Sequence, residues 1–129
     1  MFGYLDFLFL SYSGRIGRAT FWLSITALTF IEWGVLWLLM LATHDVWSAV
    51  TKNGPLPDDF FMRIIVPMMI IIVLFLYPGY ALYTKRWHDR DKSGWWSLIG
   101  FVPIIGGFWL LIELGFLGGT PGSNRFGSR

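Results

Sequence analysis

The sequence of 129 residues contains no cysteine and few charged residues. Without cysteine the chain has no disulfides, no thiolate metal ligands and no thiol chemistry. Charged residues account for 14% of the chain, whereas soluble domains carry about 25%. The net charge of only +2 gives no reason to expect a nucleic-acid partner. These shortages argue against a soluble domain of ordinary composition.

Apolar residues take the place of the missing charges. Hydrophobic residues make up 55% of the chain, and eight Trp and twelve Phe help to bring the aromatic share to 19%. A soluble fold of this size cannot bury so much apolar surface, but lipid solvates it. The composition therefore predicts a small integral membrane protein that forms a single domain over residues 1–129.

Three apolar segments are long enough to cross a bilayer: residues 20–43, 60–83 and 95–117. Each holds about 23 residues, or roughly 35 Å at the rise of an α-helix. The sequence therefore predicts an all-α membrane protein with three transmembrane helices. Pro78 is expected to kink or break the second helix. Because Pro103 lies in its middle, the third segment either crosses the membrane fully or turns back to the side from which it started.

The two ends of the chain are shorter and differ in composition. Residues 2–12 are aromatic and too short to span, which fits a short helix lying in the membrane interface. A loosely ordered terminus is the alternative. Residues 118–129 are rich in Gly and Ser and are expected to be extended or mobile. Asn124 and Arg125 are unusual in a mobile end and suggest that this tail docks, with a solvated tail as the alternative.

The orientation is predicted from the positions of Lys and Arg. With three spans, the N-terminus and the loop at 84–94 share one side, which holds six basic residues against four on the other. The six are Arg15, Arg18, Lys85, Arg86, Arg90 and Lys92, and the four are Lys52, Arg63, Arg125 and Arg129. Cytoplasmic loops carry the excess of basic residues, so the N-terminus is predicted to be cytoplasmic.

The most polar stretch, residues 85–96, follows the second apolar segment and so lies at a membrane surface. It predicts a site for an anionic head group, from an anionic phospholipid or a polyprenyl phosphate, because Arg offers paired donors to phosphate. The residues assigned to this site are Arg15, Arg18, Lys85, Arg86, His88, Asp89, Ser93 and Gly94. The alternative is that the basic residues only set topology and that His88 and Asp89 hold a loop.

Catalysis has little support in the residues. His88 and Asp89 are neighbours, and adjacent residues on a helix do not face each other. No serine nucleophile with an oxyanion device accompanies them, and His44 is predicted on the opposite side of the membrane. We therefore expect no enzyme, no catalytic residue, no metal and no cofactor. An enzyme acting on a lipid phosphate through His88 and Asp89 is the remaining alternative.

Three charged side chains fall inside the predicted spans. Arg63 and Glu113 lie at similar depths, roughly 6 Å inside the same membrane surface, and are predicted to pair across helices. Glu32 lies near the middle of the first span, where it is predicted to be protonated or to line a polar cavity. A small transporter or lipid-handling subunit, working as an oligomer, would use Glu32 in this way.

Several short motifs occur in a characteristic order along the chain. They are Gly14-Arg15-Ile16-Gly17-Arg18 followed by Phe21-Trp22, Lys85-Arg86-Trp87-His88-Asp89, Ser93-Gly94-Trp95-Trp96, Pro103-Ile104-Ile105-Gly106, and Gly119-Thr120-Pro121-Gly122-Ser123-Asn124-Arg125-Phe126-Gly127. In this order, and over nearly the whole chain, they resemble the bacterial membrane family called domain of unknown function 805. The resemblance implies a multi-pass protein of the bacterial inner (plasma) membrane, without an established activity.

The chain departs from the family pattern at Lys85 and Trp87, where Arg and Leu are usual, and it lacks the frequent Pro after Phe126-Gly127. Lys85 keeps the charge but not the paired donors of Arg. The leading hypothesis is a non-enzymatic component of the inner membrane that binds an anionic lipid or a membrane partner. A second copy of the chain is one such partner.

Overall fold

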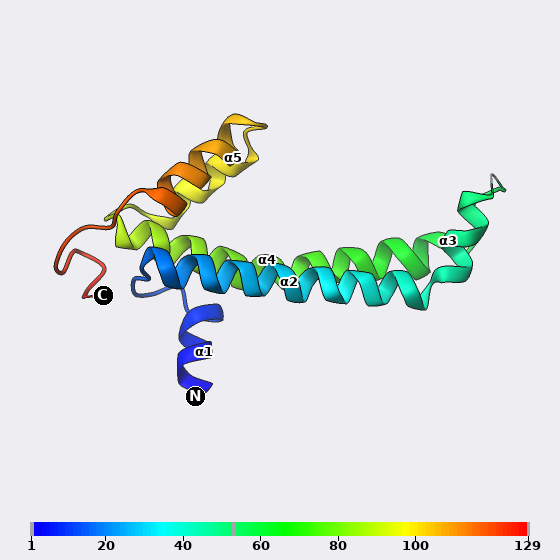
Figure 1. Ribbon diagram of the computed structural model, residues 1–129, viewed down its shortest axis with the longest axis horizontal. Helices are drawn as coiled ribbons and strands as arrows, with labels where there is room; N and C mark the ends of the chain where they lie inside the picture. The colour runs from blue at the N-terminus through cyan, green and yellow to red at the C-terminus, as the bar shows by residue number, and fades with distance from the viewer. Residues whose placement is uncertain (1, 53, 129) are drawn as a thin grey trace. The chain divides into compact units, whose positions relative to one another are not determined.

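The computed structural model describes residues 2–52 and 54–128 as helices joined by short connections (Figure 1). In chain order the elements are α1 (Phe2–Phe9), α2 (Arg18–Ala42), α3 (His44–Thr51), η1 (Phe61–Ile65), α4 (Val66–Asp89), η2 (Gly94–Phe101), α5 (Ile105–Leu110) and η3 (Leu111–Phe116). Within these residues the structure has no β-strand, only one isolated bridge between Asn124 and Gly127. The predicted all-α class is confirmed.

The chain divides into two compact units. The first unit comprises Met1–Ala27 with Tyr77–Arg129, and the second comprises Leu28–Leu76. All the motifs that characterise the sequence belong to the first unit. Its buried apolar side chains are Leu8, Ile16, Phe21, Ala81, Leu82, Trp87 and Leu114. The second unit has a smaller buried apolar set, Val46 and Ile64.

Two helical stretches are long and apolar enough to cross a bilayer. They are Arg18–Ala42, with 25 residues, and Phe61–Asp89, with 29. In the most apolar window of each stretch, 0% and 6% of the residues are buried within the chain. The core helix of a soluble protein would be covered by other elements, so these bare apolar sides need lipid or another protein around them.

The second of these stretches runs on where a break was predicted. Helix α4 continues through Pro78 as far as Asp89. A proline removes one intrahelical hydrogen bond, but the remaining bonds are retained because unpaired backbone groups are costly in an apolar environment. Pro67 is the second residue of α4 and follows the wide turn η1. Such a widened turn is a common accommodation inside a long helix.

The third predicted span, residues 95–117, is not a single helix, and the count of three spans is not confirmed. Two short helical arms, η2 and α5 with η3, are separated by a turn at residues 102–104, and Figure 1 shows them as the arms of a hairpin. A methyl group on Gly106 would lie 1.9 Å from the carbonyl oxygen of Ile99, so only glycine fits between the arms. Pro103 cannot continue the first arm's hydrogen bonds, and Ile104 turns the chain at φ 65°. Residues 94–116 are called the hairpin below.

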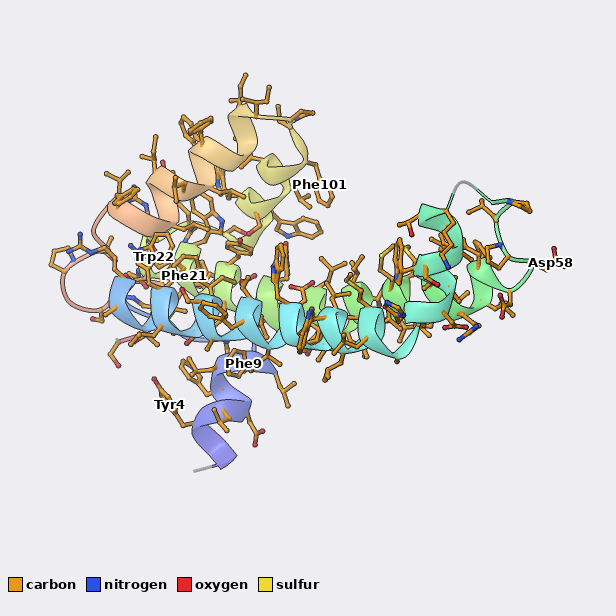
Figure 2. All side chains as sticks on the ribbon, turned by 45° about the vertical axis from the view of Figure 1, so that its right-hand side comes forward. Tyr4, Phe9, Phe21, Trp22, Asp58 and Phe101 are labelled. Atoms are coloured by element: carbon orange, nitrogen blue, oxygen red, sulfur yellow. The ribbon has the colours of Figure 1, made fainter. Side chains whose placement is uncertain are left out.

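The N-terminal helix α1 begins where the short helix predicted for residues 2–12 begins, but it ends earlier, at Phe9. Tyr4 projects from it with an exposed side chain (Figure 2). Leu5 is also exposed, whereas Leu8 is buried. One side of α1 therefore contacts the rest of the first unit, and the other side is open.

Candidate functional site

The last two turns of α4 are the most deeply buried part of the first unit. Lys85, Arg86 and Asp89 have exposed fractions of 0%, although all three carry charged groups. Burying such groups is costly unless each is paired and hydrogen-bonded. Arg86 and Asp89 are paired with each other, and Lys85 donates hydrogen bonds to three backbone carbonyls; together the three residues join distant parts of the chain.

Arg15, Asp89 and Arg86 form a buried cluster, called the ion triad below. Nη2 of Arg15 lies 3.1 Å from Oδ1 of Asp89, and Nη1 of Arg86 lies 2.5 Å from Oδ2. Each carboxylate oxygen thus accepts from a different arginine. The side chains have no exposed surface, so water does not screen these contacts.

The other donors of the two arginines bind backbone carbonyl groups. Nε of Arg86 donates to Leu114 O at 2.8 Å, and Nη2 donates to Leu117 O. These carbonyls lie at the end of the hairpin, where a helix leaves its last C=O groups without intrahelical partners. Arg15 donates to Gly122 O at 2.6 Å and to Gly127 O at 2.9 Å in the tail. The ion triad therefore joins α4, the hairpin and the tail.

Lys85 serves the N-terminal helix in a similar way. Its Nζ donates to Phe7 O and Leu8 O at 2.6 Å and to Ser11 O at 2.5 Å. An ammonium group has three donors, and here each one meets a carbonyl at or after the C-terminal end of α1. A cation at this end of a helix also stabilises the helix dipole. Lys85 thus fixes α1 to α4.

The tail docks on the end of α4. Nδ2 of Asn124 donates to His88 O at 2.8 Å, and Oγ1 of Thr120 donates to Asp89 O at 3.0 Å. The ring of Phe126 stacks on that of His88, with centroids 3.8 Å apart and planes 7° apart. At the surface, Nε of Arg125 lies 3.2 Å from Oδ1 of Asp91.

His88 is also tied to the segment before α2. Its Nδ1 lies 3.2 Å from Gly14 O, and because a carbonyl only accepts, Nδ1 carries the proton in this contact. With its ring stacked and its Nδ1 bound, His88 is positioned as a packing residue.

The remaining residues of the predicted head-group site lie apart from the ion triad. Arg18 is exposed at the start of α2, where its Nη1 donates to Phe116 O at 3.0 Å. Ser93 caps the N-terminus of η2, where its hydroxyl accepts from Trp95 N at 3.5 Å. Gly94 is buried against Thr84 and accepts a hydrogen bond from the Tyr80 hydroxyl. Five of the eight predicted residues lie together at the buried end of α4: Arg15, Lys85, Arg86, His88 and Asp89. Arg18 faces outward.

Glu113 belongs to a second charged cluster, at the base of the hairpin. Oε1 of Glu113 accepts from Nζ of Lys92 at 3.0 Å, and Oε2 lies 2.8 Å from Nε of Arg90. The contact with Arg90 is an ion pair without hydrogen-bond alignment, since neither atom makes a hydrogen bond. Lys92 also lies over the rings of Trp87 and Trp96, at 5.4 and 5.6 Å from their centroids. Cation–π contacts of this kind add to the ion pairs.

Arg63 and Glu113 were predicted to pair, but each has other partners. Nη1 of Arg63 lies 2.7 Å from Oδ2 of Asp45 and 3.3 Å from Oδ2 of Asp59, all within the second unit. The prediction assumed that residues 95–117 cross the membrane. Because the hairpin doubles back, Glu113 returns to Arg90 and Lys92 instead.

Glu32 is half-buried on α2. Among residues 2–52 and 54–128 it has no hydrogen bond or ion pair. The same described residues contain no group of three His, Asp or Glu side chains that could hold a metal ion.

Sequence reasoning missed the acceptors that the buried cations use, because most of them are backbone carbonyls. It also missed Thr120, whose backbone carbonyl and hydroxyl both accept from Nη2 of Arg15. The signal that could have found it was the run from Gly119 to Gly127, which is too specific for a free tail. Arg90 and Lys92 were used only to predict the orientation in the membrane. Glu113, their partner in the structure, was predicted to pair with Arg63 instead.

The chain was compared with known proteins. The family described as "Protein of unknown function (DUF805)" matches residues 9–128. "Inner membrane protein YhaH" of Escherichia coli strain K12 is 31% identical over 123 residues, covering 92% of this chain and 86% of the relative. "Uncharacterized protein YiiR" of the same strain is 30% identical over 141 aligned positions, covering 91% and 84%. "Inner membrane protein YhaI" is 47% identical over 62 residues, covering 47% and 50%. No solved structure matches.

Proposed function

Because the chain belongs to the DUF805 family, which includes inner membrane proteins of unknown function, we propose that it is a non-enzymatic inner-membrane component that binds an anionic lipid. In this proposal most residues of the family motifs build the binding module and do not contact the lipid themselves. They hold the hairpin, the tail and α1 around the end of α4. The surface around that module, where Arg18 is exposed, contacts the lipid.

The ion triad is the observation that carries this proposal. Arg15 and Arg86 direct their donors to Asp89 and to backbone carbonyls in the hairpin and tail. A phosphate bound by either arginine would have to displace contacts that are already made in a dry environment. A role in holding the fold therefore fits these residues better than direct contact with a ligand.

The placement of His88 and Asp89 supports a non-enzymatic role. Both carboxylate oxygens of Asp89 accept from arginines. The ring of His88 is covered by Phe126, and its Nδ1 binds Gly14 O. A general acid or base has to reach the proton that it transfers, and these groups are turned toward the protein.

The hairpin supports two full membrane crossings with both chain ends on the same side. It begins after Ser93 and ends beside Arg86, so the tail returns to the end of α4. Arg129 lies outside the described residues, and seven of the other nine Lys and Arg residues belong to the first unit. The remaining two, Lys52 and Arg63, lie between α2 and α4. By the positive-inside rule this distribution favours a cytoplasmic first unit more strongly than three spans would.

The topology is tested by labelling single cysteines, which the chain permits because it has none of its own. Ser13→Cys, Thr51→Cys and Ser128→Cys each replace an exposed residue. A membrane-impermeant maleimide added to intact spheroplasts is expected to label only Thr51→Cys, and permeabilised membranes should label all three. Labelling of Ser128→Cys in intact spheroplasts would contradict the proposed course of the hairpin.

Lipid binding is tested by native mass spectrometry of the protein released from bacterial membranes in a mild detergent. The expected spectrum contains protein with a retained anionic phospholipid or polyprenyl phosphate. Protein that carries only neutral lipid, or none, would overturn the proposal. The same spectrum reports whether the chain forms an oligomer.

A second candidate function, proton-coupled transport by an oligomer, is supported by Glu32. This carboxyl lies within the apolar run of α2 and lacks a partner among the described residues. Groups of this kind inside a membrane are commonly functional. Glu32→Gln removes the titratable proton but keeps the size of the side chain. Unchanged pH-dependent uptake in vesicles carrying this variant would exclude a coupling role for Glu32.

A further inference from the structure

An apolar cavity lies between α2 and the hairpin in the first unit. Its volume is about 220 Å³. It is lined by Phe21, Trp22 and Ile25 of α2, Tyr83 of α4, and Gly107, Leu110, Leu111 and Gly115 of the hairpin. Figure 2 shows Phe21 and Trp22 on the first turns of α2. Neither the buried ion triad nor the docking of the tail uses these side chains.

A more polar hollow lies one helical turn away, at the start of α2. It is lined by Gly17, Arg18, Ala19, Gly118 and Gly119. Arg18 and Trp22 are four residues apart on α2, so they lie on the same face. They also donate to adjacent carbonyls at the end of the hairpin, Arg18 to Phe116 O and Trp22 Nε1 to Gly115 O. The polar hollow and the apolar cavity therefore lie next to each other along α2 and the end of the hairpin.

The geometry points to one occupant for both spaces, a single anionic glycerophospholipid. Its phosphate would bind at Arg18 in the polar hollow, and one acyl chain would enter the apolar cavity beside Trp22. This inference rests on the proposed lipid-binding function and gives the lipid a location. It replaces the predicted head-group site of eight residues with one in which Arg18 is the only shared member.

The charge of Arg18 favours a phosphate over a neutral head group. A guanidinium has five N–H donors, and Arg18 uses one of them for a hydrogen bond within the described residues. Its side chain is exposed, so the remaining donors are accessible. Arginine binds phosphate oxygens through pairs of such donors.

The size and depth of the cavity favour an acyl chain over a protein helix. A helix with its side chains is about 10–12 Å wide, which is too wide for a cavity of about 220 Å³. Arg18 is the first residue of α2, and Trp22 and Ile25 follow about one and two turns later. If α2 enters the bilayer at Arg18, the cavity lies at the depth of the upper acyl chains while the polar hollow lies among the head groups.

Gly107 keeps the cavity open. A methyl group built on Gly107 meets no atom within 4 Å, although this residue lies in α5 and lines the cavity. A side chain can therefore be added at this position of the lining, starting from a Cβ that displaces no neighbour. Gly34 on α2 has the same open surroundings but lies far from the cavity along the helix, in the second unit. The two glycines form a matched pair for an experiment.

The test measures lipid retention in nanodiscs that contain phosphatidylcholine and phosphatidylglycerol, followed by extraction and native mass spectrometry. Wild-type protein is expected to retain phosphatidylglycerol. Arg18→Gln should lower this retention at least tenfold, whereas Lys52→Gln, which changes an exposed basic residue of the second unit, should leave it unchanged. Gly107→Leu should also lower it at least tenfold, with Gly34→Leu as the control. Gly107→Ala adds only a methyl group to a helix and should give a smaller loss even if Gly107→Leu misfolds.

The outcomes separate this inference from the proposed function. If wild-type protein retains phosphatidylglycerol and every variant retains it equally, the lipid binds elsewhere and only this inference fails. If wild-type protein retains no anionic lipid, both fail. If Gly107→Leu dissociates an oligomer but leaves lipid retention unchanged, the occupant is a second copy of the chain, and the inference is also overturned.

Discussion

The two units each contain a cluster of arginine and aspartate, and the clusters differ in their contact with solvent. In the first unit two arginines share Asp89, and all three side chains are 0% exposed. In the second unit two aspartates share Arg63, with side chains between 39% and 64% exposed. Exposed ion pairs contribute little to stability, whereas removing one partner of a buried pair leaves an uncompensated charge. The same residue types are therefore expected to contribute far more to stability in the first unit than in the second.

The first unit can contain such a cluster because its backbone supplies the remaining acceptors. The ion triad has one more positive than negative charge, and the carbonyls of the hairpin and tail accept from the surplus donors. This arrangement requires several segments to be in place together. The exposed cluster around Arg63 needs only α3 and the start of the next helix, and water substitutes for any contact that is lost.

The largest effect is expected for Asp89→Asn. This change leaves Arg15 and Arg86 buried without their carboxylate, and breaking a buried pair in this way costs about 3–5 kcal/mol. Thermal unfolding in detergent should show a large loss of stability together with release of the tail to added protease. If Asp89→Asn unfolds at the same temperature as wild-type protein, the buried cluster does not hold the first unit together.

Lys85→Met should have the next largest effect. Methionine keeps the length of the side chain but removes the ammonium from three carbonyls. Loss of hydrogen bonds to a charged donor, with acceptors left buried, is expected to cost about 2–3 kcal/mol. Hydrogen exchange should then increase in α1 before it increases in the hairpin. Equal protection of α1 in both proteins would show that Lys85 is not its attachment.

Asn124→Ala tests the docking of the tail. The change removes the hydrogen bonds from Nδ2 to His88 O and Thr120 Oγ1 but leaves the ion triad intact. We expect a loss of about 1 kcal/mol and faster proteolysis within residues 119–128. Ser123→Ala is the control, because the exposed Ser123 side chain makes no hydrogen bond in the described part of the chain. A tail cleaved at the same rate in wild-type protein and in Asn124→Ala would argue against docking through Asn124.

The smallest effect is expected for Asp45→Asn in the exposed cluster. The hydrogen bonds from Arg63 hold the pKa of the Asp45 carboxyl below its ordinary value of 3.8. A lowered pKa contributes stability above the ordinary value, and that contribution is lost as the pH falls through the lowered one. Because most of the Asp45 side chain is exposed, thermal unfolding near neutral pH should barely change. The direct readout is an NMR titration, in which Arg63→Gln should raise the pKa of Asp45.

The long helices could be predicted from the sequence because continuous apolar runs specify them. Residues 20–43 correspond to Arg18–Ala42 within two residues. The sequence could not distinguish the hairpin from a third membrane-spanning helix, because an apolar segment of this length can form either structure. That ambiguity produced the wrong pairing of Arg63 with Glu113, which depended on the depth of each residue in a straight helix. Pro103 indicated where the chain turns, but not whether the segment then crosses the membrane or returns.

The sequence predicted which residues come together at the site better than it predicted what those residues bind. The motif at residues 14–18, the polar stretch and the tail motif identified Arg15, Arg86, His88, Asp89 and Asn124, and the structure gathers all five at the end of α4. Their interpretation as a head-group site assumed that basic residues near a membrane surface face lipid. The sequence does not show that backbone carbonyls of the hairpin and tail occupy these donors, because backbone acceptors have no signature in the sequence.

The contacts of Arg15 have a consequence for the biogenesis of the protein. Its acceptors in the tail lie 105 to 112 positions further along the chain, so they are synthesised long after Arg15. Helix α2 reaches the insertion machinery long before those carbonyls leave the ribosome, and the first unit cannot close until they have emerged. Until then Arg15 remains hydrated at the membrane surface. A nascent chain that stops before residue 120 therefore never acquires the finished state, and its open polar surface distinguishes it from the complete protein for membrane proteases.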